Sequence, residues 1–265
     1  MLQKLLKTIK FTKKKMSKIL SFLVRKLDLY SYYGFLNSYF IKNKLSKKGI
    51  NISRYRLYDK TWLKNLKIST VIDIGANVGE FTNIFNELFP LSEIHAFEPI
   101  PECFNKLNER VRDYTNIKTY NIGLGSKEGE LNLNKSSHDP ASSFREMADL
   151  HKKNYPHSSS SVELKVPIQR LDDVFKSTNL DNNIFIKIDV QGFEDEVIKG
   201  GIETFGRAKV IIVESSYQKL YENEPLFHGI YSLLQPLGFE FMGSLKQSKF
   251  HVDESYLQGD CIFIK

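Results

Sequence analysis

Cysteine is scarce in this sequence. Only Cys103 and Cys261 occur among 265 residues, without a C-x-x-C spacing or a partner cluster of histidines. This excludes a disulfide framework and a structural zinc site, and two reduced thiols in the cytoplasm are expected. No His and Asp cluster of the ligand type points to a catalytic metal ion either.

Long apolar runs are absent as well. No stretch reaches 18 apolar residues, and the longest early run, residues 19–24, is interrupted by Ser21. A transmembrane helix is therefore not expected. A signal peptide is not expected either, because the basic start is followed by too short an apolar region and by no small-residue cleavage site.

Acidic residues are nearly missing from the first 70 positions. This segment holds 18 Lys and Arg against two acidic residues, Asp28 and Asp59, and so has a net charge of +16, whereas residues 71–265 hold 20 against 29 and have a net charge of −9. A core with a basic face for nucleic acid would not be this acidic. Contact with a polyanion is thus expected to run through the N-terminal segment.

Residues 1–67 are predicted to form a basic amphipathic helical arm. Large apolar residues recur at helical spacing, with lysines between them, in residues 2–9 and 16–27. One interpretation is peripheral contact of residues 1–30 with the inner face of a membrane, where each Lys or Arg contributes about 1 kcal/mol. The other is a helix that packs on the core or on a second copy in a homodimer. The aromatic-rich residues 30–40 favour packing over binding of sugar or RNA bases.

From residue 68 onward, apolar runs alternate with helical patterns. This alternation predicts βαβ units and a mostly parallel sheet in a domain that spans residues 68–265. A polar, serine-rich stretch at 138–161 shows no sustained period and is predicted to be a mobile loop. Strands are predicted at 70–74, 93–97, 117–122, 130–134, 162–168, 184–188, 210–213, 239–242 and 261–264, with the last two as an antiparallel pair.

A glycine turn follows the first of these strands. Gly75 and Gly79 lie four residues apart, just before a helical pattern. Such a turn presents backbone N–H groups and a helix N-terminus to a polar ligand. The G-x-G-x-x-G pattern of a dinucleotide site is incomplete, and Asp73 would repel a pyrophosphate but could hold a cationic amino group. The turn therefore favours S-adenosylmethionine over NAD.

Carboxylates also end the other central strands. Glu98 follows Asp73 by 25 residues, before a rigid Pro99, and can accept both hydroxyls of a ribose; the alternative is a solvated strand-end glutamate.

Lys187, in the strand at 184–188, and Asp189, just after it, are two residues apart and so point to the same side. They form either a reactive pair or a structural ion pair. Glu214 ends the next strand in the same row. Glu194 could line the substrate mouth.

Seven segments together resemble the FkbM family of S-adenosylmethionine-dependent methyltransferases. The resemblance spans about residues 68–265. It implies an α/β class I methyltransferase (Rossmann-like) fold, with a mostly parallel seven-stranded sheet and an antiparallel last strand. It also implies S-adenosyl-L-methionine as cofactor and a hydroxyl of a sugar, glycan or related natural product as acceptor. Gln191 departs from the family, which more often has Glu there. The segments are DIGANVG (73–79), FEP (97–99), NIGLG (121–125), Ser142-Ser143, RLDD (170–173), KIDVQGFEDEVIKGG (187–201) and VESS (213–216).

The resemblance suggests roles for individual residues. Methyl transfer from a sulfonium is an in-line displacement that depends on positioning, with a base that takes the hydroxyl proton. Asp189 is the expected base, Lys187 would orient it or stabilise the oxyanion, and Glu194 would join them. The serine-bearing loop would cover the acceptor, and its His138, His151 and His157 are alternative bases. The expected cofactor contacts are Asp73, Gly75, Asn77 and Gly79 for the methionine part, Glu98 for the ribose, and Asn121 and Ile122 for the adenine.

Two other functions remain open. An RNA ribose 2'-O-methyltransferase would use a constellation like Lys187, Asp189 and Glu214, with the arm on the phosphates. The missing second lysine and the acidic core speak against it, so nucleic acid is not expected as a partner. The third interpretation is a membrane-associated scaffold that has kept the fold without turnover.

Overall fold

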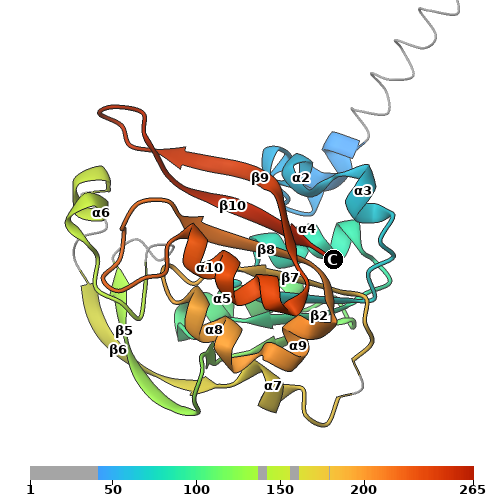
Figure 1. Cartoon of the computed structure of the whole chain (residues 1–265). Coiled ribbons are helices and arrows are strands. Elements are labelled where there is room, and N and C mark those ends of the chain that lie inside the picture. The colour runs from blue at the N-terminus through green and yellow to red at the C-terminus, as the bar shows by residue number, and fades with distance from the viewer. Residues whose placement is uncertain (1–40, 137–141, 156–160, 179) are drawn as a thin grey trace, which may run out of the picture. The chain divides into compact units, whose positions relative to one another are not determined.

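The computed structural model describes residues 41–136, 142–155, 161–178 and 180–265 (Figure 1). The chain divides into two compact units, 1–52 and 53–265. In the first unit, residues 41–47 are helical. The first 40 residues lie outside the described part, so the predicted arm and its boundary at residue 67 stay predictions. No described helix is long and apolar enough to cross a membrane.

The second unit is built on a seven-stranded sheet with the order β3-β2-β1-β7-β8-β10-β9. Neighbours from β3 to β8 pair in parallel, and β10 pairs antiparallel with both β8 and β9. This confirms the predicted mostly parallel sheet with an antiparallel closing pair. The strands are β1 (Thr70–Ile74), β2 (Glu93–Phe97), β3 (Ile117–Tyr120), β7 (Ile184–Ile188), β8 (Ala208–Ser216), β9 (Glu240–Lys249) and β10 (Tyr256–Ile264).

The central strands are short and apolar because helices cover both faces of the sheet. Every residue of β1 and β7 is buried, as expected for parallel strands between helical layers. In Figure 1, α8, α9 and α10 lie together on one side of the sheet, and α7 packs on α8 and α9. On the other face, α4 packs on β1 and β2, and α5 packs on β3. The helices are α2 (Ile52–Tyr58), α3 (Thr61–Lys64), α4 (Glu80–Leu88), α5 (Pro101–Val111), α7 (Leu171–Val174), α8 (Glu194–Gly200), α9 (Ile202–Arg207) and α10 (Phe227–Leu234).

The alternation of side chains in β7 divides its residues between the two faces. Ile184, Ile186 and Ile188 belong to the core that includes the apolar residues of α8, α9 and α10. Phe185 faces the opposite way, and its ring meets that of Phe85 in α4 at a centroid distance of 5.0 Å. Lys187, two residues further along, therefore points to the α4 face as well. A charged side chain is thus buried beneath a helix.

A second, three-stranded sheet has the order β4-β6-β5. Its strands are β4 (Gly123–Leu124), β5 (Gly129–Ser136) and β6 (Ser161–Gln169), and β5 and β6 form the long ribbon in Figure 1. The strands predicted at 130–134 and 162–168 are thus confirmed, with slightly wider bounds.

The prediction of a mobile loop at 138–161 was wrong for part of this segment. Residues 149–154 form a helix, α6 (Asp149–Asn154). Its six residues are fewer than two turns, which is too short for a helical period to appear in the sequence. Tertiary contacts hold it: the backbone N–H of His251, beyond the end of β9, donates to the Asn154 side-chain oxygen at 3.1 Å.

Gly75 allows the turn after β1 to pass close to the end of β7. It has a φ of +79°, and a Cβ there would lie 1.9 Å from the Asp189 carbonyl oxygen. We expect Gly75→Ala to lower the free energy of unfolding by at least about 2 kcal/mol, since left-handed strain alone costs about 1–2 kcal/mol. Urea unfolding measures this change. Gly206→Ala in α9 is the matched control, because a Cβ there meets nothing within 4 Å; an equal loss of stability in both variants would contradict the explanation.

Candidate active site

A cavity of about 510 Å³ lies at the carboxyl ends of β1, β2 and β7. Open α/β sheets bind their ligands at this edge, and the volume is typical of small-molecule sites. One side of the cavity is formed by the glycine turn, Glu98 and Ile122, and the other by acidic side chains of β8, β10 and the end of β7. The lining residues used below are Gly75, Asn77, Glu98, Ile122, Ser142, Phe144, His151, Tyr155, Asp189, Gln191, Glu214 and Asp260.

The glycine turn is held by the neighbouring strand β2. The backbone N–H groups of Gly75 and Ala76 donate to the Phe97 carbonyl oxygen at 3.1 and 2.9 Å. Asn77, with a φ of +50°, donates its N–H to Glu98 Oε2 at 2.8 Å. The other carboxylate oxygen of Glu98 accepts the Ile100 N–H at 2.8 Å. A carboxylate has about four lone-pair sites, so Glu98 can fix this turn and still accept hydroxyl groups from a ligand.

The structure brings only some of the predicted cofactor residues to the cavity wall. Gly75, Asn77, Glu98 and Ile122 line it. The other three do not belong to its described lining, and their contact with a cofactor stays a prediction. Those three residues are Asp73, Gly79 and Asn121.

Asp73 and Asn121 support the site from behind. Asp73 is fully buried and accepts a hydrogen bond from the Thr82 hydroxyl at 2.6 Å. Burial raises its pKa. The Asn121 amide donates to the backbone oxygens of Glu98 and Pro99 at 2.9 and 3.1 Å, which shapes the turn after β2.

An ion pair joins Lys187 to Asp189. Nζ lies 3.1 Å from Asp189 Oδ2, and the side chains of the two residues are 2% and 26% exposed. Nζ also lies 4.5 Å from the centre of the Phe81 ring. Burial opposes the charge of Lys187, but Asp189 and Asp73 outweigh it and raise the pKa of the amine. Burial likewise opposes ionisation of Asp189, but the charge of Lys187 and the hydrogen bonds that the carboxylate accepts together outweigh it, so that the Asp189 pKa stays below its ordinary value.

Two further carboxyl groups face this pair. Glu214 of β8 and Asp260 of β10 are opposite residues in the antiparallel ladder. Burial, reinforced by Asp189, raises the pKa of Glu214 well above its ordinary value, and burial raises that of Asp260 to about 6. Glu214 was predicted from the sequence, but Asp260 was not. The only signal for Asp260 is its register in β10, which becomes visible once the pairing with β8 is known.

Gln191 connects these carboxyl groups. Its backbone has a φ of +55°, and its side-chain nitrogen Nε2 lies 2.7 Å from Asp189 Oδ1 and 2.6 Å from Glu214 Oε2. Its Oε1 accepts a hydrogen bond from the Tyr221 hydroxyl at 2.8 Å. A neutral amide thus bridges two carboxyl groups at the position where the resemblance implied a third.

Glu194 lies at the start of α8 and is not part of the described cavity lining. Its side chain is 4% exposed, and its Oε1 accepts the N–H groups of Val190 and Gly192 at 3.3 and 3.1 Å. Burial raises its pKa to about 8. These contacts shape the turn that carries Gln191, and the predicted part of Glu194 in the reaction stays a prediction.

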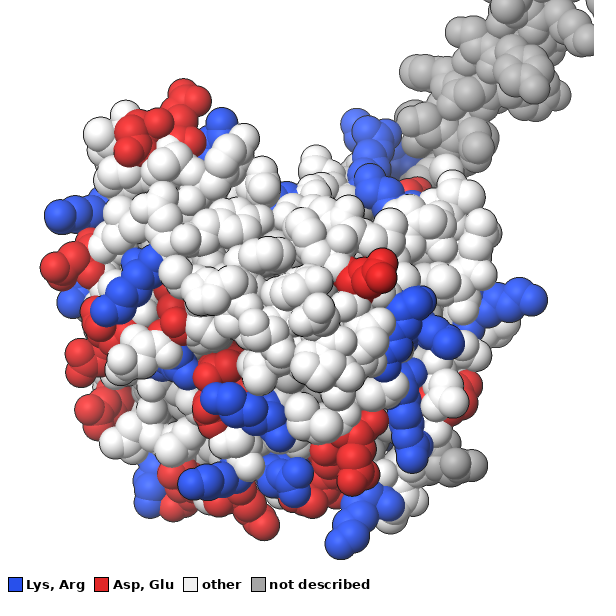
Figure 2. All heavy atoms as spheres, in the orientation of Figure 1, with Lys and Arg blue, Asp and Glu red and all other residues white. Residues whose placement is uncertain are grey.

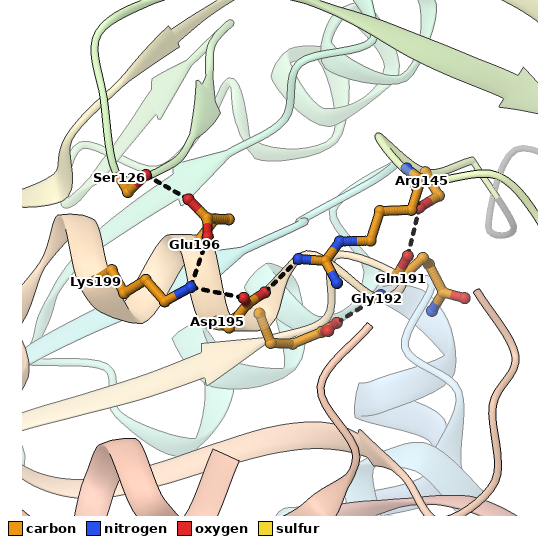
Figure 3. A network of polar contacts seen from close by, with 9 residues as sticks. Ser126, Arg145, Gln191, Gly192, Asp195, Glu196 and Lys199 are labelled. Carbon is orange, nitrogen blue, oxygen red and sulfur yellow. Dashed lines mark hydrogen bonds and ion pairs between the residues drawn. The ribbon is translucent and has the colours of Figure 1, made fainter. Parts of the chain in front are cut away.

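The segment that contains α6 is tied to the β7–α8 turn. Arg145 pairs with Asp195 at 2.7 Å, and Asp195 in turn pairs with Lys199 at 2.8 Å (Figure 3). The Ser143 hydroxyl donates to the Gln191 backbone oxygen at 2.5 Å. Ser142, Phe144, His151 and Tyr155 of this segment line the cavity. Of the three histidines predicted as alternative bases, His151 thus belongs to the site, and His138 and His157 lie outside the described residues.

Residues 73–241 match the methyltransferase FkbM domain. The chain therefore belongs to the FkbM methyltransferase family and is an S-adenosylmethionine-dependent methyltransferase, as the sequence resemblance implied.

Similar proteins come from bacteria, archaea and fungi. The 2-O-methyltransferase NoeI of Sinorhizobium fredii is 28% identical over 62% of this chain and 70% of its own length. The hexuronic acid methyltransferase AglP of Haloferax volcanii is 27% identical over 54% of each chain. A solved methyltransferase FkbM from Methylobacillus flagellatus aligns with a TM-score of 0.49 and 14% identity over 79% of this chain and 48% of that one. This chain thus spans about half of the last two proteins.

The buried ion pair makes a testable contribution to stability. We expect Lys187→Met to lower the free energy of unfolding at pH 7 by about 2–4 kcal/mol, because it leaves buried carboxylates without their cation. The loss should shrink below pH 3.8, the ordinary pKa of Asp189, since a protonated Asp189 needs no cation. Urea unfolding across this pH range measures both effects.

Lys199→Met is the control, because Lys199 pairs with two carboxylates but is 44% exposed. We expect it to cost less than about 1 kcal/mol. A pH-independent loss in Lys187→Met would show that packing of the lysine stem, rather than its charge, is what matters.

Proposed function

We propose that the protein transfers a methyl group from S-adenosylmethionine to a hydroxyl of a sugar, glycan or related natural product. The observation that carries the proposal is the Asp189 carboxylate, paired with Lys187, in the same cavity as the glycine turn and Glu98. A donor bound at the turn and a hydroxyl bound at Asp189 would share one cavity. The printed names of NoeI and AglP, a 2-O-methyltransferase and a hexuronic acid methyltransferase, support this acceptor class.

The residues at the turn fit S-adenosylmethionine. Glu98 is a buried carboxylate that presents acceptor oxygens for the two ribose hydroxyls. Ile122 and Phe97 provide an apolar wall for the adenine. Gly75 brings the backbone close to the position where the methionine part would lie. When bound, the cofactor supplies an electrophilic methyl group on a positively charged sulfur.

The side chains on the other side of the cavity fit an acceptor hydroxyl. Asp189 can accept the hydroxyl proton while the acceptor oxygen attacks, and its contacts with Lys187 and Gln191 hold the carboxylate in one orientation. Lys187 is not among the described residues that line the cavity, so it would act on the reacting oxygen through Asp189. Ser142, Phe144 and Tyr155 line the same cavity and would lie against a bound acceptor.

Binding of RNA has no comparable support. On the face of the second unit that Figure 2 shows, acidic and basic side chains are interspersed among uncharged ones. Tracking of phosphates needs a continuous basic groove. A hydroxyl-rich small acceptor fits the cavity better.

Variants of Glu98 and Asp189 separate cofactor binding from chemistry. We expect Glu98→Ala to abolish binding of S-adenosylmethionine in calorimetry, because the ribose acceptors are lost. Asp189→Asn should bind the cofactor normally and lower kcat by about 10²–10⁴-fold, the usual contribution of a general base. The assay measures release of S-adenosylhomocysteine with a panel of methyl glycosides of neutral hexoses and of hexuronic acids.

Wild-type protein that does not bind the cofactor would remove the enzyme hypothesis. Methylation of RNA but of no glycoside would show that the acceptor is RNA and not a sugar or glycan. Equal loss of cofactor binding in both variants would contradict the separate roles of the two residues.

A further inference from the structure

His151 lines the cavity and has one ring nitrogen without a hydrogen-bond partner among the described residues. The residue belongs to α6, is 4% exposed and lines the cavity wall. Its Nε2 lies 3.3 Å from the Tyr221 hydroxyl, and the two rings are 5.0 Å apart. Its Nδ1 is buried and has no hydrogen-bond partner among the described residues. An unpartnered buried nitrogen at a cavity wall is costly unless a ligand satisfies it.

The hydrogen-bond chain behind His151 starts at the ion pair. Lys187 keeps Asp189 ionised, so Asp189 can only accept a hydrogen bond. The atom of Gln191 that faces it at 2.7 Å must then be the amide nitrogen, and the second hydrogen of this nitrogen serves Glu214 at 2.6 Å. The orientation of the Gln191 amide is thereby determined, with its oxygen turned toward Tyr221.

The orientation of Gln191 determines the tautomer of His151. The Tyr221 hydroxyl can donate one hydrogen bond, and it donates this bond to Gln191 Oε1 at 2.8 Å. The same hydroxyl can only accept from the histidine, so His151 Nε2 carries the hydrogen. A neutral imidazole with a hydrogen on Nε2 has its lone pair on Nδ1. Burial lowers the pKa of His151 to about 4, which keeps the ring neutral near pH 7.

We propose that His151 is a substrate-recognition residue whose Nδ1 accepts a hydrogen bond from a second hydroxyl of the acceptor, one that is not methylated. This inference rests on the proposed function and narrows its substrate to a molecule with at least two hydroxyl groups. His151 is not the base in this scheme, because Asp189 takes the proton of the reacting hydroxyl. Tyr221 and Gln191 are positioning residues that hold the imidazole in the accepting tautomer.

A pair of substitutions separates the two ring nitrogens. His151→Gln places an amide near Nε2, so it keeps a donor for Tyr221 and loses the acceptor at Nδ1. His151→Asn places an amide near Nδ1 and restores an acceptor there. With a methyl hexoside that the wild type methylates as probe, we expect His151→Gln to raise the acceptor KM about tenfold, as for one lost hydrogen bond.

His151→Asn should recover part of this loss, and both variants should bind S-adenosylmethionine as the wild type does. His228→Gln, on the exposed side of α10, is the control and should leave the KM unchanged. An unchanged KM in His151→Gln, or no recovery in His151→Asn, would overturn the proposal.

A spectroscopic measurement tests the tautomer without any acceptor. In long-range ¹H–¹⁵N spectra of the labelled full-length protein at pH 7, we expect His151 to show a hydrogen on Nε2 and a bare Nδ1, assigned by comparison with His151→Gln. Tyr221→Phe should lose this preference. A protonated or Nδ1–H ring in the wild type would overturn the proposal even if methylation of hexosides is observed. The expected spectrum without methylation of any glycoside would instead point to failure of the proposed acceptor class.

Discussion

The contact between Lys187 and Asp189 is the interaction on which the rest of this site depends. β7 is an apolar strand buried on both faces, and a single amine in it lies beneath α4, 3.1 Å from a carboxylate at the cavity wall. Neither charge would be stable alone at that depth. Together they keep one carboxylate ionised in a place where burial raises the pKa values of Glu214 and Asp260. The site therefore holds neighbouring carboxyl groups with different proton affinities, which acid–base chemistry requires.

The ion pair also orders the polar groups around it. An ionised Asp189 orients the Gln191 amide, and the amide oxygen accepts a hydrogen bond from the Tyr221 hydroxyl. This hydroxyl in turn accepts a hydrogen bond from His151. Each group in this chain has only one arrangement compatible with its neighbour. Networks of this kind stay rigid when every member has its hydrogen-bond partners. His151 Nδ1, at the end of this network, has no partner among the described residues.

Much of the fold could be predicted because its strands are short apolar runs between turns. β1, β2 and β7 have the bounds expected from the sequence, and the antiparallel closing pair is also confirmed. Of the site, the glycine turn, Glu98, Asp189 and Glu214 could be found because they directly follow or end such runs. Asp260 could not, since it lies within an antiparallel strand whose register against β8 is set by tertiary pairing. Tyr221 carried no signal, and α6 was too short to show a period.

The sequence by itself determined the type of fold, the family and the position of the cofactor turn, because these follow from local patterns: apolar strands, two glycines and the carboxylates after them. Only the tertiary structure decided which of those carboxylates face the cavity. It turned Asp73 toward Thr82 of α4 and Glu194 toward the backbone of the β7–α8 turn. It also brought Asp260 and His151, from distant parts of the chain, to the cavity that Asp189 lines. The physical reason is that hydrogen-bond geometry and charge balance in a buried site depend on neighbours in space, and a linear pattern contains no information about them until the sheet order is known.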